Sequence, residues 1–127
     1  MTFAHVSVRT SDMDRSIDFY REYLGMKLIR RREIPQNNAE IAFLGDEGSD
    51  FSLELTHYRD QERFEQAEYG SRLFDHLAFL VDDLPKVVER IIDAGFTVTD
   101  QPFELSPGRW LAFIEDPDGT LIELIQK

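Results

Sequence analysis

Two similar stretches decide the fold: FAHVSVRT at residues 3–10 and FDHLAFLV at residues 74–81. Each places a histidine, His5 or His76, near the start of a short apolar run that is typical of a β-strand. The chain has only three histidines in 127 residues. Two of them opening look-alike strands so far apart indicates that the chain repeats itself.

The segments after these two strands repeat in the same order. A helical pattern ending in glycine follows each strand, and later extended segments contain the tripeptides LEL and IEL. From His5 to Glu54 is 54 − 5 = 49 positions, and from His76 to Glu123 is 123 − 76 = 47 positions. This near-equal spacing predicts duplication of one structural unit.

Apolar residues with a 3.6-residue period predict one amphipathic helix in each half. Ser11 or Asp12 can cap the first helix, Pro85 fits the first turn of the second, and Gly25 and Gly95 supply left-handed C-terminal stops. The stripes expected to face one way are Met13, Ile17, Tyr20 and Leu24 in the first helix, and Leu84, Val88, Ile91 and Ile92 in the second.

The predicted fold class is α+β, with two tandem βαβββ modules forming a curved mixed sheet with the helices outside. The runs AEIAFLG, DFSLELTHY, GRWLAFIED and TLIELIQ are expected strands, with turns at GDEGSD and DPDGT. Module one spans about 1–60 and module two about 72–127, joined by the polar segment 59–74. The length suggests a single domain, 1–127.

Composition limits the function. The formal net charge of −11 argues against nucleic acid, because phosphate contacts need clustered Lys and Arg. The one basic run, Arg30–Arg32, is expected to be a solvated strand or loop face, with an anchor for an anionic substrate tail as the alternative. The absence of cysteine excludes disulfides and thiolate ligands. With no visible signal peptide or membrane span, we expect a cytoplasmic protein.

Alternation along the strands decides which side chains can meet. His5 shares a face with Arg9, and Glu54 shares a face with Thr56, whereas His57 points to the opposite face. His57 has no counterpart in the second half, where Gln126 takes its place. We therefore give His57 no role in the candidate site.

Each module thus carries one His and one Glu on strand faces that could line the same concave sheet. A buried carboxylate is costly unless it is paired or binds a metal. His5, Glu54, His76 and Glu123 form a nitrogen and oxygen ligand set that suits a divalent ion such as Zn²⁺, Ni²⁺, Co²⁺, Mn²⁺ or Fe²⁺. Single strand residues of these types are more often core or solvent-facing, but four at matched positions favour a metal site.

The chain resembles the glyoxalase I family of the vicinal oxygen chelate superfamily. The resemblance rests on LGMKL at the exit of the first helix, on LELT and HLAFLV, and on DPDGTLIEL near the end. It implies one divalent metal per site, nickel or zinc ahead of cobalt, manganese or iron, held by His5, Glu54, His76 and Glu123. It also implies a homodimer whose sites are shared between subunits, although the sequence leaves pairing within one chain open.

The resemblance implies a lactoylglutathione lyase-like enzyme, a metal-dependent carbon–sulfur lyase. Such enzymes convert the hemithioacetal of methylglyoxal and a thiol, glutathione in most members, to an S-lactoyl thioester by proton transfer through an enediolate. It assigns Glu123 as the principal base and Glu54 as its partner, although their near-symmetric placement leaves the order open. Arg9 and Arg72 match arginines that contact the thiol substrate.

Three residues depart from the family pattern and leave the identity of the thiol open. Tyr58 stands where an Asn is expected, Gln101 near an expected Lys, and Asp75 in place of a Gly before the second His. The alternatives are an acyl-CoA epimerase, a ring-cleaving dioxygenase or a non-catalytic small-molecule resistance protein. Glu54 favours the isomerase, because the other classes carry Gln or no carboxylate there, or lack the metal ligands.

Overall fold

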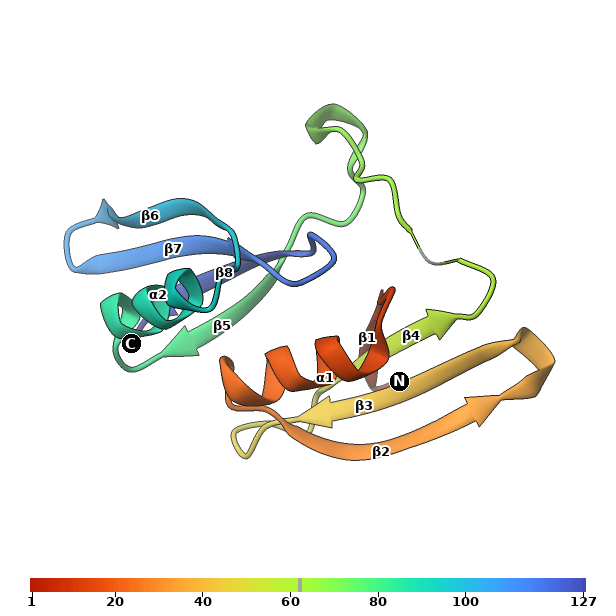
Figure 1. Cartoon of the computed structure of the whole chain (residues 1–127). Helices are drawn as coiled ribbons and strands as arrows, with labels where there is room; N and C mark the ends of the chain where they lie inside the picture. Colours follow the sequence, from red (N-terminus) through yellow and green to blue (C-terminus); the bar gives the residue numbers. More distant parts are fainter. Residues whose placement is uncertain (62) are drawn as a thin grey trace. The chain divides into compact units, whose positions relative to one another are not determined.

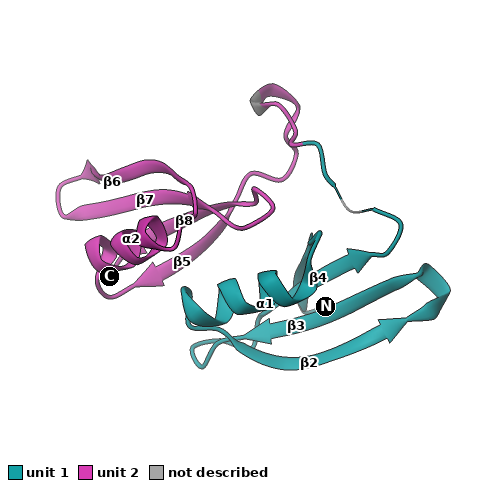
Figure 2. Cartoon of the chain, in the orientation of Figure 1, with its two compact units in different colours: residues 1–65 teal, residues 66–127 magenta. Residues whose placement is uncertain are grey.

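The computed structural model describes residues 1–61 and 63–127, and the chain divides into two compact units, residues 1–65 and 66–127 (Figures 1 and 2). Each unit contains one of the predicted modules. The single domain expected for the whole chain stays a prediction. Of the described helices, none is long and apolar enough to cross a membrane.

The first unit is a mixed sheet with one helix. Its elements are β1 (His5–Arg9), α1 (Met13–Glu22), β2 (Lys27–Ile34), a 3-10 turn (Pro35–Asn37), β3 (Ala39–Gly45) and β4 (Ser52–Tyr58). The strand order is β1-β4-β3-β2. β1 runs parallel to β4, whereas the other two pairings are antiparallel. The first strand is therefore hydrogen-bonded to the last, which brings the two ends of the module together.

The second unit repeats this topology. Its elements are a 3-10 turn (Tyr69–Ser71), β5 (Leu77–Val81), α2 (Leu84–Asp93), β6 (Val98–Ser106), β7 (Arg109–Glu115) and β8 (Leu121–Gln126). The order is β5-β8-β7-β6, again with one parallel pair, β5 and β8. The predicted βαβββ modules are confirmed, although His76 lies just before β5 rather than inside it.

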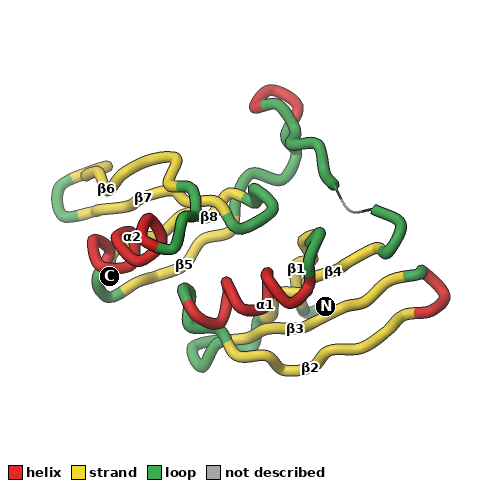
Figure 3. Tube along the Cα trace, viewed as in Figure 1, coloured by secondary structure: helices red, strands yellow, loops and turns green. Residues whose placement is uncertain are grey.

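In each unit the helix lies against one face of the sheet (Figure 3). In the first unit, Leu53 and Leu55 of β4 are fully or almost fully buried. Glu54, between them, points to the opposite face, because strand side chains alternate. We call the sheet face that the helix does not cover the open face. The leucines of β4 therefore pack on the helix side, and Glu54 projects from the open face.

Helix α1 follows its expected pattern with one shift. Asp12 is its N-cap, and its side chain accepts a hydrogen bond from the backbone N–H of Arg15. Gly25 adopts the left-handed conformation, with φ of +68°. Met13, Ile17 and Tyr20 are buried as predicted; Leu24 lies beyond the helix end and is half-buried, and Phe19 is buried as well.

For helix α2, the predicted buried stripe is wrong at one residue. Leu84, Val88 and Ile91 are buried, but Ile92 is 47% exposed. At 100° per residue, a residue eight positions after Leu84 points about 80° away from it, at the margin of an apolar stripe. Asp83 caps this helix by accepting from the backbone N–H of Lys86.

His57 and Gln126 occupy corresponding positions in the two units. Each hydrogen-bonds to the turn between the first strand and the helix of its unit. The Nδ1 of His57 lies 3.0 Å from the carbonyl oxygen of Thr10. Gln126 accepts a hydrogen bond from the backbone N–H of Leu84 through Oε1 at 2.6 Å and donates through Nε2 to the carbonyl of Val81 at 3.5 Å. The structure therefore explains His57 as a turn-closing residue.

Replacing Gln126 with Ala should destabilise the second unit. The variant leaves the backbone N–H of Leu84, at the start of α2, without its acceptor, which should lower the free energy of unfolding by about 1–3 kcal/mol. Urea denaturation would measure the change. The exposed Gln101→Ala variant is the control, and an equal effect of both variants would contradict this role.

Candidate functional site

The open face of the first sheet carries His5, Ser7 and Arg9 of β1, all exposed. β4 lies beside β1, with Ser7 opposite Glu54 in the parallel register. Because both strands alternate, Glu54 and Thr56 project from the same face as His5. The expected sharing of a face is confirmed.

A line of hydrogen bonds holds the Glu54 carboxylate. The Oγ1 of Thr56 donates to Oε1 of Glu54 at 3.0 Å, and the Ser7 hydroxyl lies 2.9 Å from the same Oγ1. Since Thr56 gives its proton to Glu54, Ser7 must be the donor to Thr56. The other carboxylate oxygen, Oε2, lies 3.7 Å from Nε2 of His5. One oxygen of Glu54 is thus fixed by the sheet, and the other faces the imidazole.

Phe43 of β3 completes the first His–Glu pair. It sits opposite Glu54 in the β3–β4 register. Its ring meets the His5 ring edge to face, with centroids 5.2 Å apart and planes at 86°. The Phe43 ring therefore restricts how the His5 imidazole can turn.

The second unit builds the same arrangement with His76, Glu123 and Phe113. The Nε2 of His76 lies 3.2 Å from Oε2 of Glu123. Phe113 is opposite Glu123 in the β7–β8 register, and its ring lies 5.7 Å from the His76 ring at 83°. Both glutamate side chains are 17% exposed, so each carboxylate is largely shielded from water. We call these two groupings the first and second ligand pairs.

The two ligand pairs differ in what supports them. In the second unit, Ala78 and Ile125 occupy the places of Ser7 and Thr56, so no hydroxyl reaches Glu123 from those positions. Instead, Oδ2 of Asp75 accepts from Nδ1 of His76 at 2.6 Å. The first pair therefore has a tethered carboxylate, and the second has a tethered imidazole.

The sequence analysis gives Phe43 and Phe113 no role, and the structure places both against a histidine. Each lies opposite the glutamate of its own module, a register that only the pairing of a third strand reveals. Within the described residues, no group of three or more His, Asp or Glu side chains is suited to a metal. Each His–Glu pair alone thus offers only two candidate ligands.

A pocket of about 490 Å³ opens beside the first ligand pair. Glu54, Arg9 and Tyr58 line it together with apolar residues that include Ile34 and Ile41. The Arg9 guanidinium lies 4.7 Å over the Tyr58 ring, a cation–π contact, and its Nη1 donates to Gln61. The Arg9 guanidinium thus places a positive charge in the pocket lined by Glu54, and its contacts with Tyr58 and Gln61 hold it there.

The basic run in β2 divides between the two faces of the sheet. Arg31 donates to Asp14 of α1 and to Glu40 of β3, and the hydrogen bond to Asp14 raises the pKa of the Arg31 guanidinium. Arg30 instead lies 4.5 Å over the ring of Phe43 on the open face. The expectation of a solvated, ion-paired strand holds for Arg31, while Arg30 lies beside the first ligand pair.

Arg72 and Gln101 lie elsewhere in the second unit. Arg72 follows the 3-10 turn Tyr69–Ser71 and is half-buried, and Gln101 is exposed on β6. In the described part of the chain neither makes an ion pair or hydrogen bond with His76 or Glu123. The substrate role of Arg72 stays a prediction.

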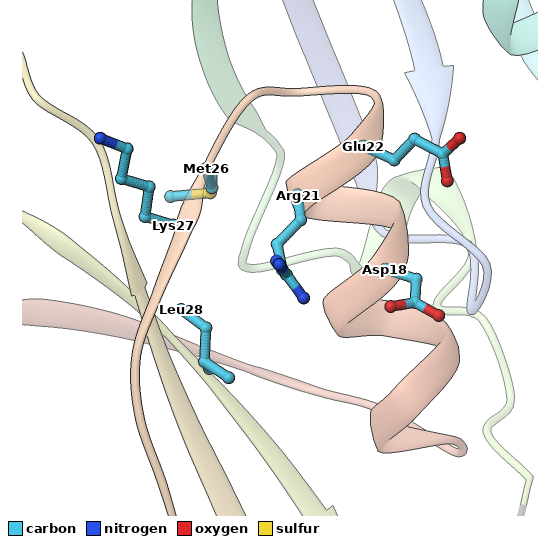
Figure 4. A pocket seen from close by; sticks show the side chains of 6 residues that line it. All are labelled: Asp18, Arg21, Glu22, Met26, Lys27 and Leu28. Carbon is cyan, nitrogen blue, oxygen red and sulfur yellow. The ribbon is translucent and has the colours of Figure 1, made fainter.

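Another surface pocket, of about 610 Å³, lies between α1 and the start of β2 (Figure 4). It contains none of the four candidate ligands, and we assign it no role. Its lining residues are Asp18, Arg21, Glu22, Met26, Lys27 and Leu28.

Comparisons with known proteins identify the family to which the chain belongs. Residues 2–124 match the model of the Glyoxalase/Bleomycin resistance protein/Dioxygenase superfamily. A lactoylglutathione lyase of Neisseria meningitidis is 40% identical over 131 residues, covering 100% of this chain and 91% of that protein. A probable chloroplastic lactoylglutathione lyase of Arabidopsis thaliana is 42% identical over 97% of this chain, which spans only 35% of that relative.

The crystal structure of glyoxalase I from Zea mays matches 97% of this chain and 43% of its own, with a TM-score of 0.82 and 36% identity. The chain therefore spans less than half of the plant proteins and nearly all of the Neisseria protein. By its matching model and by its identity over the full length of the chain, the protein belongs to the glyoxalase I (lactoylglutathione lyase) family of this superfamily.

Proposed function

We propose that this protein is a lactoylglutathione lyase, which isomerises the hemithioacetal of methylglyoxal and glutathione to S-lactoylglutathione. The observation that carries the proposal is the repeated pair, His5 with Glu54 and His76 with Glu123, each on the open face of its sheet. The relatives at about 40% identity carry the same activity in their names. A cytoplasmic location belongs to this proposal, because glutathione is a principal thiol of the cytosol.

The residues of the two ligand pairs fit a divalent metal. They supply two imidazole nitrogens and two carboxylates, a donor set that suits ions from Mn²⁺ to Zn²⁺ and contains no thiolate. In each pair an Nε2 faces a carboxylate oxygen, as expected of neighbouring ligands of one ion. When bound, such an ion supplies Lewis acid stabilisation to oxygens on which negative charge develops. Nickel or zinc is our first choice.

Glu123 is the proposed base. It removes the proton from the substrate carbon that bears sulfur and delivers it to the neighbouring carbon, while the hydroxyl proton passes from the oxygen of the first carbon to that of the second. The hydroxyketone thus becomes a hydroxythioester without net gain or loss of atoms. Among the described residues the Glu123 carboxylate accepts no hydrogen bond, and Nε2 of His76 lies 3.2 Å from its Oε2, whereas Thr56 donates to Glu54. Glu123 therefore has an oxygen available for the proton, and Glu54 is its partner on the opposite side.

Arg9 is the proposed contact for a carboxylate of the thiol. Its guanidinium is stacked on Tyr58 in the pocket that also contains Glu54. A permanent cation in the same pocket as Glu54 can hold the carboxylate tail of a substrate whose reacting carbons lie at the metal. Arg72 is proposed for the same task from the second unit.

We further propose that the protein is a homodimer in which the first ligand pair of one subunit joins the second ligand pair of its partner. Each pair by itself supplies only two ligands, so a complete centre needs one of each kind. A two-fold dimer satisfies this need twice and gives two equivalent sites.

Activity of metal-free protein is the direct test of the function. Methylglyoxal and glutathione should give no thioester until Ni²⁺, Co²⁺, Mn²⁺ or Zn²⁺ is added singly. In the best reconstituted form, Glu123→Gln should lower kcat by about 10²–10⁴-fold, the usual contribution of a general base. The exposed Glu89→Gln on α2 is the control. Tight metal binding without thioester formation would contradict the proposed substrate.

Subunit mixing tests the shared sites. His5→Ala and His76→Ala homodimers should each be inactive, because every site loses a ligand. After unfolding and refolding of an equal mixture, half of the dimers are mixed and each mixed dimer has one intact site, so about a quarter of wild-type activity should return. If both ligand pairs of a site come from one chain, no activity will return.

A further inference from the structure

The contact between Asp75 and His76 sets the protonation pattern of the second ligand pair. A carboxylate only accepts hydrogen bonds, so Nδ1 of His76, at 2.6 Å from Oδ2 of Asp75, must carry the ring proton. Nε2 lies 3.2 Å from Oε2 of Glu123, and none of the hydrogen bonds found among the described residues joins these two atoms, so Nε2 is the nitrogen left for a metal. Asp75 thereby presents His76 in the form that binds a metal.

The first ligand pair lacks this support. Ala4 precedes His5 at the position that corresponds to Asp75. Among the described residues, His5 contacts the Glu54 carboxylate and the Phe43 ring, and no carboxylate lies at its Nδ1. The difference is specific to one module, so it does not follow from the repeated fold.

Resting on the proposed function, we propose that Asp75 is a positioning residue of the metal centre. It holds His76 through Nδ1 so that Nε2 faces Glu123, while the Phe113 ring limits rotation from the side. A carboxylate on the second nitrogen of a histidine ligand orients the ring and strengthens its bond to the metal. In the second ligand pair the histidine ring is therefore already oriented for a metal, whereas in the first pair no carboxylate among the described residues orients it.

The exposure of Asp75 decides whether its charge or its hydrogen bond contributes more to holding His76. Its side chain is 65% exposed, whereas that of His76 is 31% exposed. Water screens the charge of such a carboxylate, so the hydrogen-bond geometry should contribute more than the charge. Asp75→Asn can keep an oxygen at Nδ1 without the charge, and Asp75→Gly removes both.

The first measurement reads the histidine rings of ¹⁵N-labelled, metal-free protein by long-range proton–nitrogen NMR. Wild-type His76 should be in the form protonated at Nδ1. In Asp75→Gly the ring proton should shift toward Nε2, because Glu123 is then the carboxylate beside the ring, with His5 and His57 unchanged. The exposed Asp60→Gly, in the turn after β4, is the matched control. An unchanged His76 signal in Asp75→Gly would overturn the proposal.

The second measurement is Ni²⁺ affinity, by competition with a coloured chelator. Asp75→Gly should bind Ni²⁺ about 10–100-fold more weakly than wild type, and Asp75→Asn should lose less. If the ring proton of His76 moves in Asp75→Gly but the Ni²⁺ affinity does not change, Asp75 has no role in metal binding and the proposal is overturned. Failure of the proposed function would appear differently, as wild-type Ni²⁺ binding without turnover, and both measurements on Asp75 would still decide this proposal.

Discussion

Parallel pairing of the first and last strands of each module is the constraint on which the site depends. It brings a residue from the start of the module beside one from its end, and strand alternation then decides the face on which both appear. The helix covers the other face, so buried leucines on either side of Glu54 fix the direction of the carboxylate. A shift of β4 by one residue would bury Glu54 and expose those leucines.

Much of this could be predicted from the sequence, because the period of apolar residues and the alternation along strands are local signals. The helices, the strands and the shared face of His5 and Glu54 follow from them. The sequence could not predict that Phe43 and Phe113 contact the histidines, since this depends on the register of a third strand in each sheet. Ile92 was wrongly placed in the core because it lies at the margin of its stripe.

The repeated module gives the protein two similar ligand pairs, and the residues beside them differ. The first pair has its carboxylate held by Thr56 and Ser7, and the second has its imidazole held by Asp75. In the proposed centre this leaves Glu123 as the carboxylate without a tether, which suits a group that must accept and return a proton. Departures from the family pattern, such as Asp75 and Tyr58, thus acquire physical explanations as neighbours of His76 and Arg9.

The central claim is that both ligand pairs contribute to one metal centre. X-ray absorption spectroscopy of the Ni²⁺-loaded protein tests it most directly, because imidazole rings give a distinct outer-shell signal that can be counted. We predict one ion per chain with two imidazoles and oxygen donors, and a single imidazole after either His5→Ala or His76→Ala. One imidazole in the wild-type spectrum, or a count that either substitution leaves unchanged, would contradict the account.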